Sequence, residues 1–150
     1  MNFSPVCFGA KNQQFGRFFV NSVSGEKLAS VRLVHLYGYL TCDTRIICYW
    51  SYWGCRGILF YSVENINIVI TTASNQALLP PDHFIVDHGT KWSNLPGYTS
   101  VSPELVLSFF NPYSVSPGQE LRLWYGEDLM NALAEDNGGR ACVDIYGLYV

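Results

Sequence analysis

The chain has 150 residues, a length that suits one domain with a sizeable buried core. Apolar residues make up 49% of it and charged residues only 14%, which argues against disorder and favours tightly packed sheet. The net charge is −3 and the basic residues form no run, so we expect no nucleic-acid partner. No stretch approaches the roughly 18 apolar residues of a membrane helix, so we expect no membrane insertion. Residues 1–9 lack the basic and apolar regions of a signal peptide.

Short apolar runs alternate with turn residues along the chain, a pattern typical of β-strands. The expected strands lie at residues 14–20, 31–40, 58–63, 66–72, 84–86, 105–110, 121–125 and 143–150. A proline turn at residues 79–82 and a long loop over residues 88–99 interrupt them. A weak helical pattern spans residues 129–134 and ends before the two glycines at 138 and 139. These elements predict an all-β fold, an antiparallel β-sandwich or barrel-like single domain with at most one short helix.

The strand expected at residues 31–40 carries large side chains on both faces. Strict alternation puts Val31, Leu33, Tyr37 and Tyr39 on one face and Val34, Leu36 and Leu40 on the other. Both faces of this strand are therefore expected to be covered.

The five cysteines are Cys7, Cys42, Cys48, Cys55 and Cys142. No C-x-x-C pair or zinc-finger spacing occurs, so we interpret them as a disulfide framework and expect a secreted, extracellular protein. The alternative is a set of buried free thiols in a cytosolic protein. An odd count leaves one thiol over, which predicts an interchain bond. We expect this bond at Cys7, near the N-terminus, with the other four pairing within the chain and Cys42 a plausible partner of Cys55.

An acidic cluster follows the strand at residues 121–125. Ca²⁺ prefers six to eight oxygen ligands from carboxylates, amides and backbone carbonyls. Asp136-Asn137-Gly138-Gly139 supplies two side-chain oxygens on a flexible backbone. The candidate metal ligands are Glu127, Asp128, Asp136, Asn137 and Asp144. The order of an EF-hand loop is absent, and the competing interpretation is a set of solvated turn residues.

Aromatic residues flank this cluster in the sequence. Sugars pack their apolar C–H faces on aromatic rings and hydrogen-bond through their hydroxyls to carboxylates and amides. The candidate sugar-binding residues are Glu127, Asp128, Asn137, Trp124, Tyr146, Trp92 and Arg140. Each aromatic residue taken alone is better explained as part of the sheet, and Arg140 as a surface residue.

Catalytic motifs of the hydrolases are missing. The sequence holds no G-x-S-x-G and no H-E-x-x-H. Glu127 and Asp128 are adjacent, and neighbouring strand residues point to opposite faces, which disfavours a glycosidase pair. We therefore expect a binding protein and no enzyme.

Several segments resemble a domain of cnidarian proteins. They include Trp53-Gly54-Cys55, Ser102-Pro103-Glu104-Leu105-Val106-Leu107, Leu123-Trp124-Tyr125-Gly126-Glu127-Asp128-Leu129 and Asp136-Asn137-Gly138-Gly139-Arg140-Ala141-Cys142-Val143-Asp144. Many members are uncharacterised skeletal-matrix proteins of corals, and one type is a Ca²⁺-dependent galactose-binding lectin of sea anemones, to which this chain is similar. The resemblance covers residues 31–150, the lectin-like domain; residues 1–30 form an N-terminal segment of the same domain that it does not reach.

The resemblance implies a function and an assembly. It implies a β-rich fold, Ca²⁺-dependent binding of terminal galactose on glycans, as in β-galactosides such as lactose, and a disulfide-linked homodimer. The alternative is an extracellular structural or adhesive matrix module without specific sugar binding.

Overall fold

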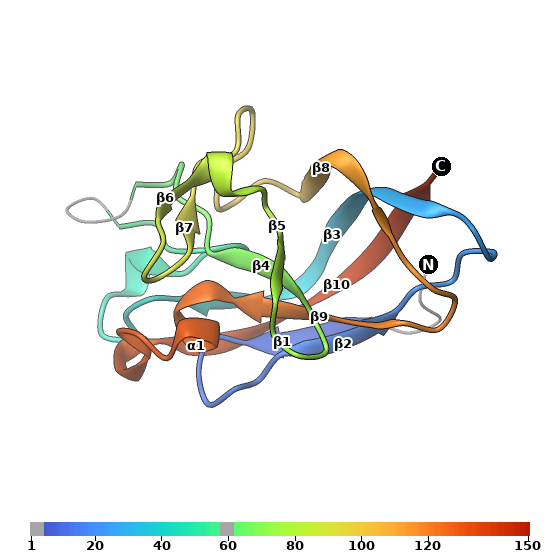
Figure 1. Ribbon diagram of the computed structural model, residues 1–150. Helices are drawn as coiled ribbons and strands as arrows, with labels where there is room; N and C mark the ends of the chain where they lie inside the picture. The colour runs from blue at the N-terminus through green and yellow to red at the C-terminus, as the bar shows by residue number, and fades with distance from the viewer. Residues whose placement is uncertain (1–4, 58–61) are drawn as a thin grey trace.

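Two antiparallel four-stranded sheets make up most of the protein. The computed structural model describes residues 5–57 and 62–150 (Figure 1). The first sheet has the order β1-β10-β3-β8, and the second has the order β2-β9-β4-β5. The first sheet consists of β1 (Val6–Gly9), β10 (Gly138–Tyr149), β3 (Lys27–Thr41) and β8 (Glu104–Ser114). The second consists of β2 (Gly16–Phe19), β9 (Glu120–Tyr125), β4 (Ile68–Thr72) and β5 (Ala77–Leu79).

The remaining elements are short. A two-stranded sheet pairs β6 (Ile85–Asp87) with β7 (Trp92–Ser93), and α1 (Gly126–Met130) follows β9 directly. Single 3₁₀ turns occur at Ile47–Tyr49, Asp82–Phe84 and Ala134–Asp136. Among the residues that the structure describes, no helix is long and apolar enough to cross a membrane. The prediction of an antiparallel all-β sandwich with at most one short helix is thus confirmed, and the sheets do not close into a barrel.

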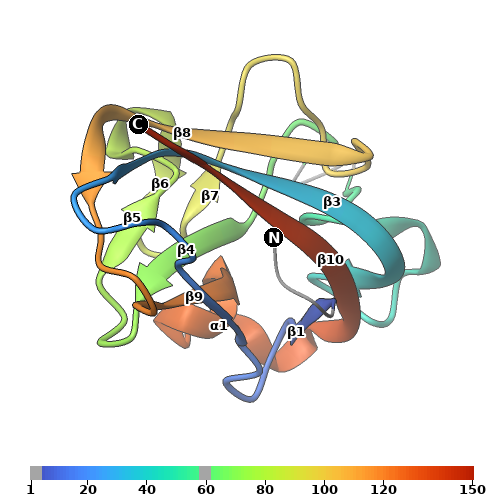
Figure 2. The same cartoon turned by 90° about the vertical axis from the view of Figure 1, so that its right-hand side faces the viewer.

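The hydrophobic core lies between the two large sheets. In β9, Leu121, Leu123 and Tyr125 are buried at alternate positions, as expected for a strand with one face on a core. They share a single cluster of buried residues with Leu33 of β3 and Val143 of β10. Figure 2 shows β8, β3 and β10 side by side as one layer, with β4 and β9 in the other.

Most predicted strands are present, with shifted bounds. The strand predicted at residues 31–40 is longer, and those predicted at 105–110 and 143–150 are also extended in the structure. The loop predicted over residues 88–99 contains the short strand β7, and the helix begins at Gly126, earlier than predicted. The strand predicted at residues 58–63 begins in a part of the chain outside the described residues, and residues 62–63 are not in a strand.

A β-bulge overturns the predicted faces of β3. His35 pairs with Val143 and Tyr37 with Cys142, which leaves Leu36 as an extra residue. The bulge shifts the alternation, so Val31 and Leu33 point into the core before it and Leu40 does so after it. Tyr37 and Tyr39 are exposed as a result, by 59% and 54%. They do not share the buried face of Val31 and Leu33, although strict alternation predicted that they would.

The disulfides correct one prediction about the cysteines. Cys42 pairs with Cys55, as we expected. Cys7, however, pairs with Cys142 of the same chain, so its assignment to an interchain bond is wrong. The physical reason is the register of the first sheet, because β1 pairs with β10 and brings these two residues directly opposite each other. Cys48 is the free cysteine of the described residues, and it is exposed.

Candidate functional site

The acidic cluster begins where β9 runs into α1. Gly126 makes this tight junction possible, since a Cβ there would lie 2.7 Å from the Asn67 side chain and 2.8 Å from the Thr90 carbonyl oxygen. Asn67 fixes the junction by accepting a hydrogen bond from the backbone N–H of Glu127 at 2.9 Å. The helix ends at Asn131, which takes the left-handed conformation with φ of 50°. Asparagine tolerates that conformation better than most residues.

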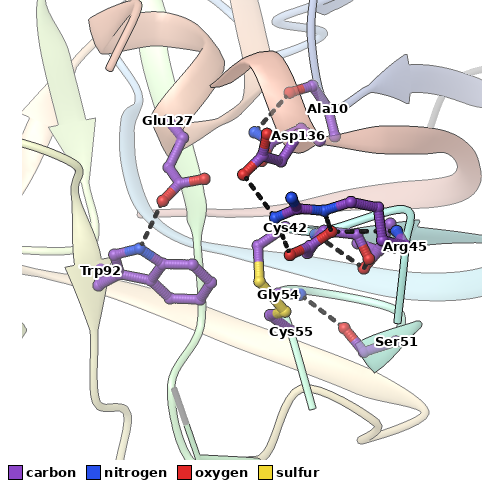
Figure 3. The surroundings of a disulfide bond; sticks show 12 residues. Ala10, Cys42, Arg45, Ser51, Gly54, Cys55, Trp92, Glu127 and Asp136 are labelled. Carbon is purple, nitrogen blue, oxygen red and sulfur yellow. Dashed lines mark hydrogen bonds and ion pairs between the residues drawn. A yellow bond between two sulfur atoms is a disulfide. The ribbon is translucent and has the colours of Figure 1, made fainter. Parts of the chain in front are cut away.

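Glu127 is a buried carboxylate with one satisfied oxygen. Its side chain is almost fully enclosed, and the indole N–H of Trp92 donates to Oε2 at 3.1 Å (Figure 3). Oε1 has no hydrogen-bond partner. Burial raises the pKa of Glu127 to about 7, against the opposing effects of Trp92 and Asn137. A buried carboxylate with an unpartnered oxygen is stabilised either by taking up a proton or by a cation bound close to it.

Asp128 holds a distant loop. Its Oδ1 accepts from the backbone N–H of Gln13 at 2.9 Å and its Oδ2 from that of Gln14 at 3.1 Å. Burial raises the pKa of Asp128, and these two hydrogen bonds oppose the rise. The N-terminal loop is thereby fastened to the start of α1.

The second half of the cluster lies on the turn before β10. Asn137 is fully buried and donates to the Ala10 carbonyl oxygen at 2.9 Å, while its own Oδ1 has no partner. Asp136 points outward, with Oδ2 3.4 Å from Nη2 of Arg45 (Figure 3). Arg45 also binds Asp43 at 2.8 Å, and this guanidinium lowers the pKa of Asp43 to about 2.

An open pocket of about 870 Å³ lies between the N-terminal loop and the segment after α1. Its lining residues are Lys11, Asn12, Gln13, Asp128, Asn131, Leu133, Ala134, Glu135 and Asp136. The lining combines three carboxylates, three amides and one lysine with two apolar side chains, so the pocket can hydrogen-bond a polar, hydroxyl-rich ligand.

Four of the five predicted metal ligands line the pocket or are next in sequence to a residue that lines it. Asp128 and Asp136 line the pocket, and Glu127 and Asn137 are their immediate neighbours in the sequence. Asp144 pairs with Val34 in the middle of the first sheet. It lies six residues beyond the start of β10, roughly 20 Å along an extended strand.

None of the predicted sugar-stacking rings lines the pocket. Trp92 is buried behind Glu127, and Trp124 is buried against Phe15 with ring centroids 4.7 Å apart. Tyr146 lies further along β10 beneath the guanidinium of Arg32, at 5.4 Å. Arg140 is exposed on β10 and is not among the lining residues.

Sequence reasoning missed most of the pocket wall. The members outside the predicted metal-binding and sugar-binding residues are Lys11, Asn12, Gln13, Asn131, Leu133, Ala134 and Glu135, of which Glu135 belongs to the acidic cluster of the sequence. For the N-terminal loop, the one available signal was the polar run of residues 11–14 between two short apolar segments. That run indicates a loop, and nothing in it indicates that the loop packs beside residues more than a hundred positions away.

The donor set fits a hard cation in part. Glu127 Oε1 and Asn137 Oδ1 are buried oxygens of the type that Ca²⁺ binds, and both lack a partner. No group of three or more His, Cys, Asp or Glu side chains in the described ranges is arranged to hold a metal ion. Backbone carbonyls, water or ligand hydroxyls would therefore have to complete the coordination.

The protein is an antiparallel β-sandwich with a polar pocket between the N-terminal loop and the segment after α1. No protein-family model matches the sequence, and no curated protein matches it either. Among solved structures, AJLec from the sea anemone Anthopleura japonica is similar to the chain, with a TM-score of 0.85 and 34% identity over 100% of this chain and 95% of that one. The chain therefore belongs to the family of this sea anemone lectin, as the resemblance predicted. The relation to coral skeletal-matrix proteins stays a prediction.

Proposed function

We propose that the protein is a secreted, Ca²⁺-dependent lectin that binds terminal galactose, and that it is a binding protein and not an enzyme. Membership of a lectin family supports carbohydrate binding. The observation that carries the proposal is the pair of unpartnered buried oxygens, Glu127 Oε1 and Asn137 Oδ1, next in sequence to two pocket-lining carboxylates. Two disulfides within the chain support an oxidising, extracellular environment.

Three residues would hold the ion. Glu127 and Asn137 contribute the unpartnered oxygens, and Asp136 contributes an exposed carboxylate. Bound Ca²⁺ would supply open coordination positions for two vicinal sugar hydroxyls. Asp144 is left out of this set, because β10 carries it away from the pocket.

The chain's own side chains would select the sugar. Galactose presents an axial 4-hydroxyl beside an equatorial 3-hydroxyl. Carboxylates of the pocket, such as Glu135, can accept hydrogen bonds from hydroxyls in that arrangement. Glucose turns its 4-hydroxyl elsewhere, which leaves acceptors unpaired and costs affinity. Leu133, which is 69% exposed, offers an apolar contact to the C–H face of the sugar in place of a ring.

Calorimetry with lactose is the decisive test. We expect binding in Ca²⁺ and none in excess chelator, because the metal-binding carboxylates alone cannot replace the ion. Undiminished affinity in chelator would contradict the role of Ca²⁺. No binding in either condition would favour the adhesive-module alternative.

Asp136→Ala is expected to lower lactose affinity at least tenfold and to weaken Ca²⁺ binding, with the circular dichroism of the β-sheets unchanged. The expectation follows from the loss of one of three protein ligands of the ion. Asp82→Ala is the matched control, since Asp82 is also an exposed aspartate in a 3₁₀ turn but does not line the pocket. Equal lactose affinity in the two variants would remove Asp136 from the site.

The homodimer is part of the same proposal, with a corrected linkage. Cys7 forms an intrachain disulfide with Cys142. Cys48 is free and exposed, and its neighbour Ile47 is an apolar side chain that is 88% exposed. We propose that Cys48 forms the interchain disulfide.

A further inference from the structure

One wall of the pocket comes from the N-terminal loop at residues 10–14. Lys11, Asn12 and Gln13 line the pocket opposite the segment after α1. Asn12 and Gln13 are exposed. None of these three side chains hydrogen-bonds or ion-pairs with another residue in the described part of the chain. The wall therefore presents an ammonium group and two side-chain amides that are available to a ligand.

Four hydrogen bonds hold this loop in place. Asp128 accepts from two consecutive backbone N–H groups, those of Gln13 and Gln14, at 2.9 and 3.1 Å. Asn137 donates to the Ala10 carbonyl oxygen at 2.9 Å, and the Gly9 N–H donates to the Gln14 carbonyl oxygen at 2.8 Å. Asp128 accepts two of these four hydrogen bonds and joins the loop to α1, so it is the principal anchor.

The anchored backbone is strained. Asn12 and Gln13 have φ of 63° and 56°, in the left-handed region that non-glycine residues avoid. Such conformations persist only where surrounding contacts hold them, and they concentrate at ligand-binding sites. Asn131 and Leu133 on the facing wall are also left-handed, with φ of 50° and 57°. Both walls of the pocket thus depend on fixed, unfavourable backbone geometry.

The pocket is larger than one sugar needs. Its volume of about 870 Å³ is near the upper end of the range for drug-sized ligands, roughly 300–1,000 Å³. A single hexose is smaller than such ligands, so a terminal galactose held on the side of Asp136 leaves room toward the N-terminal loop.

We propose that Lys11, Asn12 and Gln13 form a subsite for the sugar next to the terminal galactose, and that Asp128 is a positioning residue that holds this subsite in shape. This inference rests on the proposed function. The ligand class is then a neutral oligosaccharide with at least two sugars, whose second ring offers hydroxyl and ring oxygens to the ammonium and amide donors. Asp128 acts through the loop backbone and does not bind the ion.

The test compares lactose with methyl β-galactoside by calorimetry at saturating Ca²⁺. The wild-type protein is expected to bind lactose more tightly, because only lactose reaches the loop. Lys11→Met and Asn12→Gly are each expected to reduce this lactose preference by about two- to tenfold, the effect of losing one hydrogen bond. Lys27→Met is the matched control for the lysine, because Lys27 starts β3 and does not line the pocket. Asn75→Gly is the control for the asparagine, since Asn75 has φ of 67° in a distant turn.

Asp128→Asn separates positioning from metal binding. We expect a smaller lactose preference and faster amide exchange at residues 11–14, with Ca²⁺ affinity as in the wild type. A loss of Ca²⁺ affinity in Asp128→Asn would instead make Asp128 a metal ligand and overturn its positioning role. An equal loss of affinity for both sugars in Lys11→Met and Asn12→Gly would overturn the subsite. Failure of the wild-type protein to bind methyl β-galactoside would refute the proposed function itself.

Discussion

Glu127 shows how a buried carboxylate becomes sensitive to its surroundings. Trp92 satisfies one of its oxygens, and the other has no partner in an almost fully buried site. The ionised form is therefore destabilised in the folded protein unless a cation lies nearby. The free energy of unfolding is therefore expected to depend, through this side chain, on both pH and the proposed ion.

We predict that the ion-free protein loses stability as pH rises through neutrality. The pKa of Glu127 is about 7 in the folded state against an ordinary value of 4.5. A raised pKa contributes stability that is fully present below pH 4.5 and is lost as pH rises through 7. The gap corresponds to roughly 3 kcal/mol in the free energy of unfolding. Chemical denaturation in chelator between pH 5 and pH 8 measures it.

Glu127→Gln is the control for this prediction. Glutamine keeps the shape and can still accept from Trp92, but it does not titrate. Its free energy of unfolding in chelator is expected to stay level over the same pH range, and added Ca²⁺ is expected to stabilise the wild type more than the variant. A pH dependence that survives in Glu127→Gln would place its origin in another group.

Single residues also explain why the site was only partly predictable. Glu127, Asp128, Asp136 and Asn137 could be predicted as candidate ligands because their side-chain oxygens lie close together in the sequence. Gln13 donates to Asp128 through its backbone N–H. Every residue except proline has this donor, so the contact does not depend on the side chain and cannot be predicted from residue type. The site's second wall could therefore not be predicted from composition or spacing.

At the scale of elements, the alternation of apolar and polar residues predicted most strands, but β3 does not follow a regular alternation along its whole length. Leu33 and Leu40 are both buried in the same core although they are seven positions apart, an odd spacing that puts two residues of a regular strand on opposite faces. The extra residue at the bulge, Leu36, reverses the alternation, so that Leu40 faces the same core as Leu33. The sequence shows no clear sign of the bulge apart from the nearby Gly38. Gly38 has φ of 87°, which only glycine adopts readily.

Gly38→Ala is therefore expected to be strongly destabilising. The substituted residue would be strained at positive φ, and its Cβ would collide with the backbone carbonyl of Arg140 on the neighbouring strand β10. We expect a loss of about 2–4 kcal/mol in the free energy of unfolding, measured by chemical denaturation. Gly25→Ala isolates the backbone effect, because Gly25 has φ of 91° with open space around it. It is expected to lose only about 1 kcal/mol. Similar losses in the two variants would mean that contact between β3 and β10 does not constrain Gly38.

On the scale of the whole molecule, one disulfide links two neighbouring strands of the first sheet, and another holds the loop whose Thr44 N–H donates to the carbonyl oxygen of pocket-lining Asp136. Cys7 and Cys142 join residues 135 positions apart on neighbouring strands β1 and β10. Cys42 and Cys55 join the end of β3 to the segment after the turn that carries Cys48. Cysteine count predicted one unpaired thiol, but strand pairing decides which one it is, and pairing order is not readable from sequence spacing.

The exposed thiol leads to a prediction about assembly. If Cys48 links two chains, each dimer carries two pockets, and binding to a surface with many glycans gains avidity without any new contact in the pocket. Cys48→Ser is expected to remove the band at twice the chain mass in non-reducing electrophoresis. It should also reduce agglutination of galactose-bearing cells by at least tenfold, since one site cannot bridge two cells. Lactose affinity per chain should stay unchanged, because Cys48 does not line the pocket. A double-mass band that persists in Cys48→Ser would show that another contact joins the chains, whereas a wild-type protein that runs only as a single chain would contradict the dimer altogether.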